Sequence, residues 1–261
     1  MAGNCRPGRP NVSSTQRFFV PSSAIETGGV RFSRDQSHQM ATVLRLDIGD
    51  SVIALDNSGW QYKVALTRVR GGEAVGTIVS RTLVANEPRT KLTLYPAVIR
   101  PQRLEIALQK CTELGVGAFV PVMCERSVAG HGEDFTSNKI DRWQKIIVEA
   151  AEQSGRGKLP AIMPVMSFDH ACESVRGSSL ILWEGERHRS LREAMASFKG
   201  SFSVNLFVGP EGGYADREIE RARQAGLVPV SIGPRLLRAE TAAIAAAAAI
   251  FFANDDLGKE S

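Results

Sequence analysis

The stretch SVNLFVGPEGGYADREIERARQAGLVPVSIGPRLLRAETA, residues 203–242, decides the fold. It opens with an apolar run typical of a buried strand, which leads through a glycine-rich turn into a helical segment, Asp216 to Ala225. VPVSIG (228–233) predicts a second strand, and Ala239 to Ala253 a closing helix. Because strands that alternate with helices form a mostly parallel sheet covered on both faces, the stretch predicts an α/β domain.

The same alternation extends upstream to residue 91. We expect strands at 91–99 (KLTLYPAVI), 119–124 (FVPVMC) and 179–183 (SLILW), and helices at 101–114 and 138–154. In the first helix, Leu104, Leu108 and Cys111 recur at helical spacing, so Cys111 is expected to be a buried free thiol. Gly155 should end the second helix.

The first third of the chain has a different pattern. Residues 1–15 are rich in Gly, Pro and Ser, which predicts a disordered leader. Residues 16–86 contain short runs rich in Val, Ile and Thr, separated by turns such as DNSG (56–59), with one helical piece at 35–45. This pattern predicts a small antiparallel barrel or sandwich. The α/β domain would then occupy residues 87–261.

The charge distribution and the cysteine content limit the classes of function that the sequence allows. Residues 1–90 hold 11 Lys and Arg against 7 Asp and Glu, which accounts for the whole net charge of +4. A basic module beside a neutral one suits a nucleic-acid reader, although scattered surface arginines would give the same count. The four cysteines form no C-x-x-C pair, and residues 242–253 are too short an apolar run to span a bilayer. We therefore expect a cytoplasmic protein with no metal site and no membrane partner.

Three loops follow the carboxyl ends of predicted strands, where ligands bind in parallel α/β sheets. They are the loop with Glu184 and Gly185, the loop 208–214 (VGPEGGY) and the loop 232–241 (IGPRLLRAET). Glycines without Cβ let the backbone approach a ligand closely, but such a loop taken alone is more often a tight strand-to-helix turn. It matches neither the phosphate-binding P-loop nor G-x-G-x-x-G, which disfavours a nucleotide-dependent oxidoreductase.

The third loop leads into the apolar helix that begins at Ala239. Glu240 and Thr241 would lie in its first turn, where acidic and hydroxyl side chains also serve simply as caps. The helix is apolar all round, which predicts a buried position, either in the core or against a second subunit.

These loops, together with QKCTELGV (109–116), EAAEQSGR (149–156), RFFV (17–20) and HQMATVLRLDIGD (38–50), resemble the 16S ribosomal RNA uracil-N3 methyltransferase family. This family belongs to the SPOUT class of knotted methyltransferases. The resemblance runs from Arg17 to about Phe252. The sequence departs from the usual pattern by Tyr214 in place of Phe, Ala239 in place of Thr and Cys111 in place of Ala. None of these changes removes an obvious catalytic group.

The resemblance implies a PUA-like β-barrel followed by a SPOUT-type parallel sheet with a trefoil knot, acting as a homodimer with S-adenosylmethionine bound in the knot. It implies cofactor contacts at Leu182, Trp183, Glu184, Gly209, Glu211, Gly212, Ile232, Gly233, Leu237, Arg238 and Thr241. The implied partner is 16S rRNA within the small ribosomal subunit, methylated on a uridine of the decoding region. RNA contacts are expected from Arg17, His38 and Arg45 of the first domain.

Methylation at uridine N3 requires loss of a proton, which a carboxylate base or a cation that stabilises anionic uracil could promote. Glu211 and Glu240 are the candidate carboxylates, and Arg238 and Arg126 the candidate cations, although each could instead make a structural ion pair. Two other functions stay open: a SPOUT methyltransferase acting on a ribose 2′-OH or a guanine, and a non-catalytic RNA-binding factor of ribosome assembly.

Overall fold

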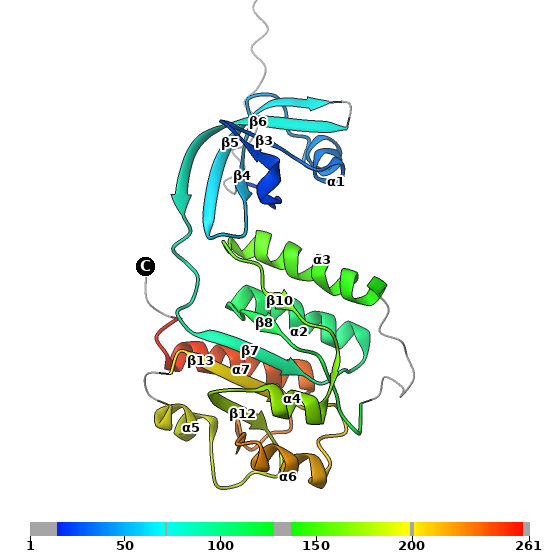
Figure 1. Ribbon diagram of the computed structural model, residues 1–261, viewed down its shortest axis with the longest axis vertical. Coiled ribbons are helices and arrows are strands. Elements are labelled where there is room, and N and C mark those ends of the chain that lie inside the picture. The colour runs from blue at the N-terminus through cyan, green and yellow to red at the C-terminus, as the bar shows by residue number, and fades with distance from the viewer. Residues whose placement is uncertain (1–14, 71, 128–136, 199–200, 258–261) are drawn as a thin grey trace, which may run out of the picture. The chain divides into compact units, whose positions relative to one another are not determined.

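The computed structural model describes residues 15–70, 72–127, 137–198 and 201–257 of the chain (Figure 1). The chain divides into two compact units, Met1–Val84 and Ala85–Ser261. The predicted leader, residues 1–15, lies outside the described residues except for Thr15.

The first unit contains one six-stranded sheet in the order β1-β4-β5-β6-β3-β2. Its strands are β1 (Arg17–Phe19), β2 (Ile25–Glu26), β3 (Gly29–Arg31), β4 (Ser51–Leu55), β5 (Trp60–Arg70) and β6 (Glu73–Leu83). The expectation of a purely antiparallel unit is wrong at one pairing, because β1 runs parallel to β4. The connection from β1 to β4 runs through β2, β3, α1 (Arg34–His38) and the π-helical turn η2 (Gln39–Val43), which is long enough for the chain to return in the same direction.

The second unit is built on a six-stranded sheet in which every pairing is parallel, as the sequence predicts. The strand order is β10-β8-β7-β13-β12-β14. The bounds are β7 (Lys91–Pro96), β8 (Ala118–Phe119), β10 (Ala161–Ile162), β12 (Ser178–Leu182), β13 (Ser203–Val208) and β14 (Val228–Val230).

The predicted strand at 119–124 is wrong as a single element. The chain forms two short strands, β8 in the main sheet and β9 (Val122–Met123), which pairs with β11 (Met166–Ser167) in a separate ladder. Pro121 lies between them and has no N–H to donate, so a continuous hydrogen-bond ladder cannot pass through it.

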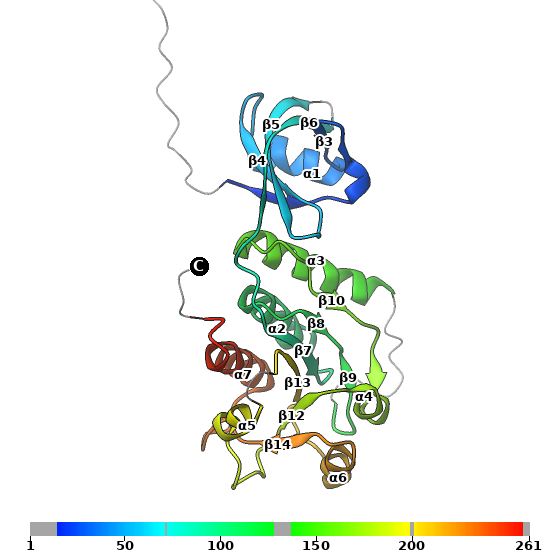
Figure 2. The same ribbon diagram turned by 60° about the vertical axis from the view of Figure 1, so that its left-hand side comes forward.

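Helices cover both faces of this sheet (Figures 1 and 2). They are α2 (Pro101–Leu114), α3 (Ser137–Ser154), α4 (Phe168–Ser174), α5 (Leu191–Ser197), α6 (Asp216–Gln224) and α7 (Ala239–Ala253). The predicted ends are confirmed for α2 and α3, which stop before Gly115 (φ 112°) and Gly155 (φ 74°) in the left-handed region that glycine favours. Helix α2 packs beside α7, and α4 beside α6.

The core lies between the central strands and these helices. On one face, the ring of Tyr95 stacks on Phe207 with centroids 4.2 Å apart, and Phe168 of α4 meets Phe207 edge-on. Cys111 is free and fully buried in α2, as expected, and burial raises the pKa of its thiol to about 12. Its thiolate is therefore scarce at neutral pH, which makes it an unreactive packing residue.

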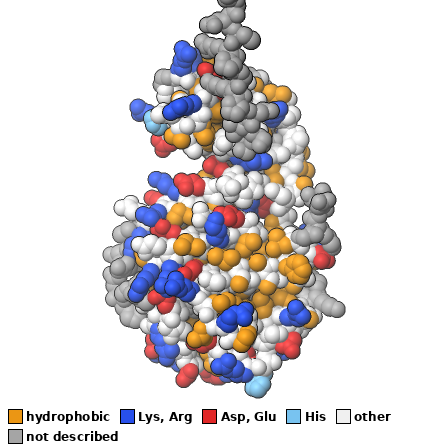
Figure 3. All heavy atoms as spheres, turned by 180° about the vertical axis from the view of Figure 1, so that it is seen from behind, with side chains coloured by type: hydrophobic (Ala, Val, Ile, Leu, Met, Phe, Trp, Pro, Cys, Tyr) orange, Lys and Arg blue, Asp and Glu red, His pale blue; other side chains and the backbone are white. Residues whose placement is uncertain are grey.

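Of the two positions that the sequence left open for α7, the core accounts for only part of the helix, because one of its faces is exposed within the single chain. Ala243, Ala247 and Ile250 face the core, whereas Phe252 on another face is 69% exposed. The exposed residues of α7 line a groove of about 980 Å³ together with residues of α5. Figure 3 shows apolar side chains gathered on one face of the second unit. The sequence does not show which face of α7 is exposed, because the residues on its buried and exposed faces are both apolar.

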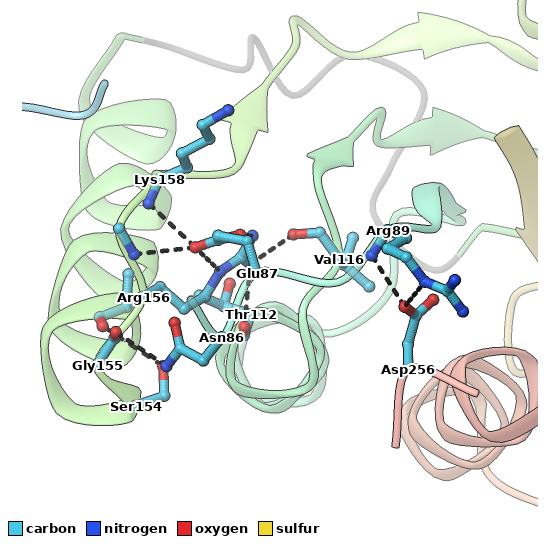
Figure 4. A network of polar contacts seen from close by, with 12 residues as sticks. Asn86, Glu87, Arg89, Thr112, Val116, Ser154, Gly155, Arg156, Lys158 and Asp256 are labelled. Atoms are coloured by element: carbon cyan, nitrogen blue, oxygen red, sulfur yellow. Dashed lines mark hydrogen bonds and ion pairs between the residues drawn. The ribbon is translucent and has the colours of Figure 1, made fainter. Parts of the chain in front are cut away.

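A buried ion pair joins the start of the second unit to the end of α3 (Figure 4). Arg156 donates from Nη2 to Glu87 at 2.9 Å and from Nη1 to the carbonyls of Thr112 and Val116 at 3.1 and 2.7 Å. Glu87 also accepts from the backbone N–H groups of Gly157 and Lys158. The segments 109–116 and 149–156, quoted above for the family resemblance, thus meet in a network that stabilises the fold.

Loss of this network should destabilise the protein strongly. Arg156→Ala leaves the Glu87 carboxylate and two carbonyls without their main donor, so we expect the free energy of unfolding to fall by about 3–5 kcal/mol. Urea unfolding followed by circular dichroism measures it. Arg142→Ala is the matched control, because the Arg142 side chain is 68% exposed in its pair with Glu105 and its loss should lower the unfolding midpoint much less. Equal losses in the two variants would contradict the assignment.

Candidate functional site

The carboxyl ends of β12, β13 and β14 lie at one edge of the sheet, because these strands are neighbours and parallel. The three predicted loops leave from this edge and enclose a cavity of about 640 Å³. All of the predicted cofactor residues line it except Thr241, which is exposed in the first turn of α7. The second unit alone forms this cavity.

The loop 208–214 is glycine-rich because its backbone packs closely against two side chains. A Cβ atom on Gly209 would lie 2.8 Å from the buried ring of Tyr214. Gly213 has a φ of +69°, and a Cβ there would lie 2.2 Å from a carboxylate oxygen of Glu184. The turn therefore meets a local packing demand and also places the loop backbone at the cavity wall.

The loops after β12 and β14 run side by side. Ser231 donates its N–H to the carbonyl of Arg189 at 2.9 Å, and Leu191 donates its N–H to the carbonyl of Ser231 at 2.8 Å. Gly233 follows with a φ of +130°, where a side chain would be strained. The residues from Gly233 to Arg238 are exposed at the mouth of the cavity.

The two candidate carboxylates converge on an arginine that the sequence analysis did not single out. Arg103, in the first turn of α2, donates from Nη1 to Oε1 of Glu211 at 2.6 Å, and its Nε lies 3.8 Å from Oε1 of Glu240. Arg100 is farther from Glu211, at 3.7 Å. The second oxygen of Glu240 is buried and has no hydrogen-bond partner among the described residues. Glu240 itself does not border the cavity, although Ala239 and Ala242 beside it do.

The two candidate cations are placed differently. Arg238 is exposed, borders the cavity and is the residue that precedes α7, without a side-chain capping bond. Arg126 donates from Nη1 to the backbone carbonyls of Gly212 and Tyr214 at 3.1 and 3.4 Å. It thus braces the loop 208–214 and does not line the cavity.

Other arginines at the cavity were also missed. Arg103, Arg187 and Arg235 line it. Arg103 could have been found, because it follows the strand at 91–99, whose carboxyl end lies at the same edge as those of the three chosen loops. Arg187 and Arg235 lie inside loops already selected, where nothing in the sequence distinguishes them from surface charge.

The predicted RNA contacts belong to the first unit. His38 and Arg45 are exposed, and Arg45 adopts a φ of 53°. Arg17 is half-buried in β1, with its Nε enclosed and unpaired among the described residues. In the described ranges, no three His, Cys, Asp or Glu side chains cluster as a metal site would require, and no helix is long and apolar enough to cross a bilayer.

Comparison with known proteins identifies the family. The model of the RNA methyltransferase domain matches residues 86–251. Ribosomal RNA small subunit methyltransferase E from Synechocystis is 34% identical over 237 residues, which cover 90% of this chain and 76% of that protein. The chain belongs to the ribosomal RNA small subunit methyltransferase E family. The resemblance drawn from the sequence motifs is therefore confirmed.

Other members of the methyltransferase E family match over nearly their whole length. The Bacillus subtilis protein is 30% identical, with 91% of this chain and 96% of that protein covered. The crystal structure of the Neisseria gonorrhoeae protein bound to S-adenosylmethionine superposes with a TM-score of 0.82 at 28% identity, covering 92% of this chain and 98% of that one. The methyltransferase E fold thus extends over both units of the chain.

The close packing at Gly209 predicts that even a methyl group at this position destabilises the protein. In Gly209→Ala the added methyl collides with the ring of Tyr214, which is buried and cannot move away, so we expect the free energy of unfolding to fall by about 1–3 kcal/mol. Gly117→Ala is the control, because a Cβ there would make only an ordinary contact at 3.7 Å. It should be neutral, or stabilising by about 0.4–1 kcal/mol. Urea unfolding of both variants decides, and equal effects would show that packing at Gly209 does not matter.

Proposed function

We propose that this protein transfers a methyl group from S-adenosylmethionine to N3 of a uridine in the decoding region of 16S rRNA, within the small ribosomal subunit. The observation that carries the proposal is the cavity bordered by the three loops after β12, β13 and β14. Support comes from the methyltransferase E relatives and from the Neisseria protein, which was crystallised with S-adenosylmethionine.

The residues of the cavity suit this cofactor. Leu182, Trp183, Ile232 and Leu237 offer apolar surface for an adenine ring, as small-molecule sites require. Gly209 and Gly212 border the cavity and can contribute only main-chain groups to it, which suits hydrogen bonds with the polar groups of a nucleoside. Bound S-adenosylmethionine supplies an electrophilic methyl carbon on a sulfonium, and the protein's task is to hold the acceptor in line with it.

The charged groups suggest how N3 is activated. Arg238 is exposed at the cavity and makes no ion pair with another described residue that would compete for its charge, so it is suited to stabilise uracil as it loses its N3 proton. Glu211 and Glu240 both face Arg103, so their charges already have a partner. We therefore assign the electrostatic role to Arg238 and a positioning role to Arg126, which braces the glycine loop.

The finer features of the fold belong to the same proposal. We propose that this part of the chain contains the trefoil knot that the family resemblance implies. The chain there leaves β14 at the sheet edge, pairs with the loop before α5 and then packs as α7 against β7 and β13. We infer that residues 16–86 form a PUA-like RNA-binding domain, which would present Arg17, His38 and Arg45 to phosphates, and that residues 87–261 form the methyltransferase domain. Because the proposed substrate is ribosomal RNA, we also propose a cytoplasmic location.

The exposed face of α7 supports a homodimer. Ala245, Ala249 and Phe252 leave apolar surface on this helix that a second copy could cover. Phe252→Glu should therefore shift the protein from dimer to monomer in sedimentation velocity, because it would bury a charge in the contact. Val79→Glu is the control, since Val79 is also exposed, at 61%, but lies in the first unit. A protein that is monomeric before substitution would refute the dimer.

The reaction is tested by nucleoside mass spectrometry of 16S rRNA. Deletion of the gene should abolish 3-methyluridine, and the wild-type protein should restore it. Arg238→Ala should restore little, with a melting temperature close to that of the wild type, because this exposed side chain contributes little to folding. Unchanged 3-methyluridine after deletion would exclude this target, and loss of a ribose or guanine methylation instead would identify a different SPOUT activity.

A further inference from the structure

Arg103 lines the cavity and connects three segments of the second unit. It projects from the first turn of α2, which follows the central strand β7. Glu211, its partner at 2.6 Å, belongs to the loop after β13, and Glu240, at 3.8 Å, begins α7 after the loop 232–238. One guanidinium thus pairs with two carboxylates, one from the loop 208–214 and one from the first turn of α7.

The charge balance makes this guanidinium necessary. The side chains of Glu211 and Glu240 are only 19% and 11% exposed, so two carboxylates would otherwise repel each other with little solvent screening. Arg100 replaces Arg103 poorly, because its side chain is 61% exposed and 3.7 Å from Glu211, and no ion pair joins it to Glu240. The arrangement therefore holds together through Arg103.

The Arg103 guanidinium and the Glu240 carboxylate could move closer together than the 3.8 Å that separates them here. The Nε of Arg103 is beyond hydrogen-bond distance from Oε1, and Oε2 of Glu240 is buried without a partner among the described residues. A buried carboxylate oxygen without a donor is costly, so a small movement that brings donor and acceptor together would be favourable. Hydrogen bonds in ligand-free sites are often long and tighten when the ligand binds.

We propose that Arg103 is a positioning residue for the cofactor: its ion pairs fix the loops 208–214 and 232–238 in the spacing that S-adenosylmethionine requires, and it acts on the cofactor through Glu211. The inference rests on the proposed function. A planar guanidinium can serve both carboxylates at once because its N–H donors point in several fixed directions, whereas the single ammonium of a lysine cannot match this geometry.

Isothermal titration calorimetry of the full-length protein with S-adenosylmethionine tests the proposal. Arg103→Gln should weaken binding at least about tenfold. Arg103→Lys should recover only part of the loss, because it restores the positive charge without the several N–H donors of a planar guanidinium. The melting temperature without ligand should change little in Arg103→Lys. Arg142→Gln is the control, since this exposed arginine of α3 pairs with Glu105 of α2, does not line the cavity, and its variant should bind like the wild type.

A double-mutant cycle with Glu211→Gln separates positioning from direct contact. If Arg103 acts mainly through Glu211, then Arg103→Gln should weaken binding by a clearly smaller factor in the Glu211→Gln background than in the wild type, because only its contact with Glu240 is then left to lose. Additive losses would overturn the proposal, as would wild-type affinity in Arg103→Gln. If Arg103→Gln does not fold, the Arg103→Lys variant decides by the same criteria in the same cycle. No binding by the wild-type protein would instead refute the proposed function itself.

Discussion

The site depends on the parallel pairing of β13 between β7 and β12. Because these strands run in the same direction, their carboxyl ends lie at one edge, and the segments that follow them meet there. A central antiparallel strand would send its loop to the opposite edge and open the cavity wall. The buried stack of Tyr95 on Phe207 joins β7 to β13, so it stabilises the pairing on which the site depends.

The residues of the loop 208–214 both pack against their neighbours and border the cavity. The ring of Tyr214 is buried against Gly209, while the carboxylate of Glu184 lies against Gly213. Arg126 donates hydrogen bonds to the backbone carbonyls of Gly212 and Tyr214 and so holds the end of the turn. The loop therefore keeps its shape through contacts behind it, and its front remains free to face the cavity. A preorganised backbone of this kind lowers the entropic cost of ligand binding.

The family motifs serve two different purposes in the structure. The loops 208–214 and 232–238 border the cavity. The segments 109–116 and 149–156 instead meet around the ion pair of Arg156 and Glu87, which stabilises the fold. A match to the family pattern therefore does not by itself indicate chemistry. The distinction lies in the burial of Arg156 and in its hydrogen bonds to main-chain carbonyls, which leave the guanidinium little capacity for a ligand.

The sequence by itself determined the long elements, the parallel α/β class and the three loops, because helical periodicity, apolar strands and glycine turns are local properties. Short elements were beyond it: α4 and α5 have seven residues each, too few for a period to emerge. Only the tertiary structure brought Arg103 to Glu211, 108 residues away, and showed that one side of α7 stays exposed. Ion pairs of this kind depend on the order of strands in the sheet, which local pattern does not encode.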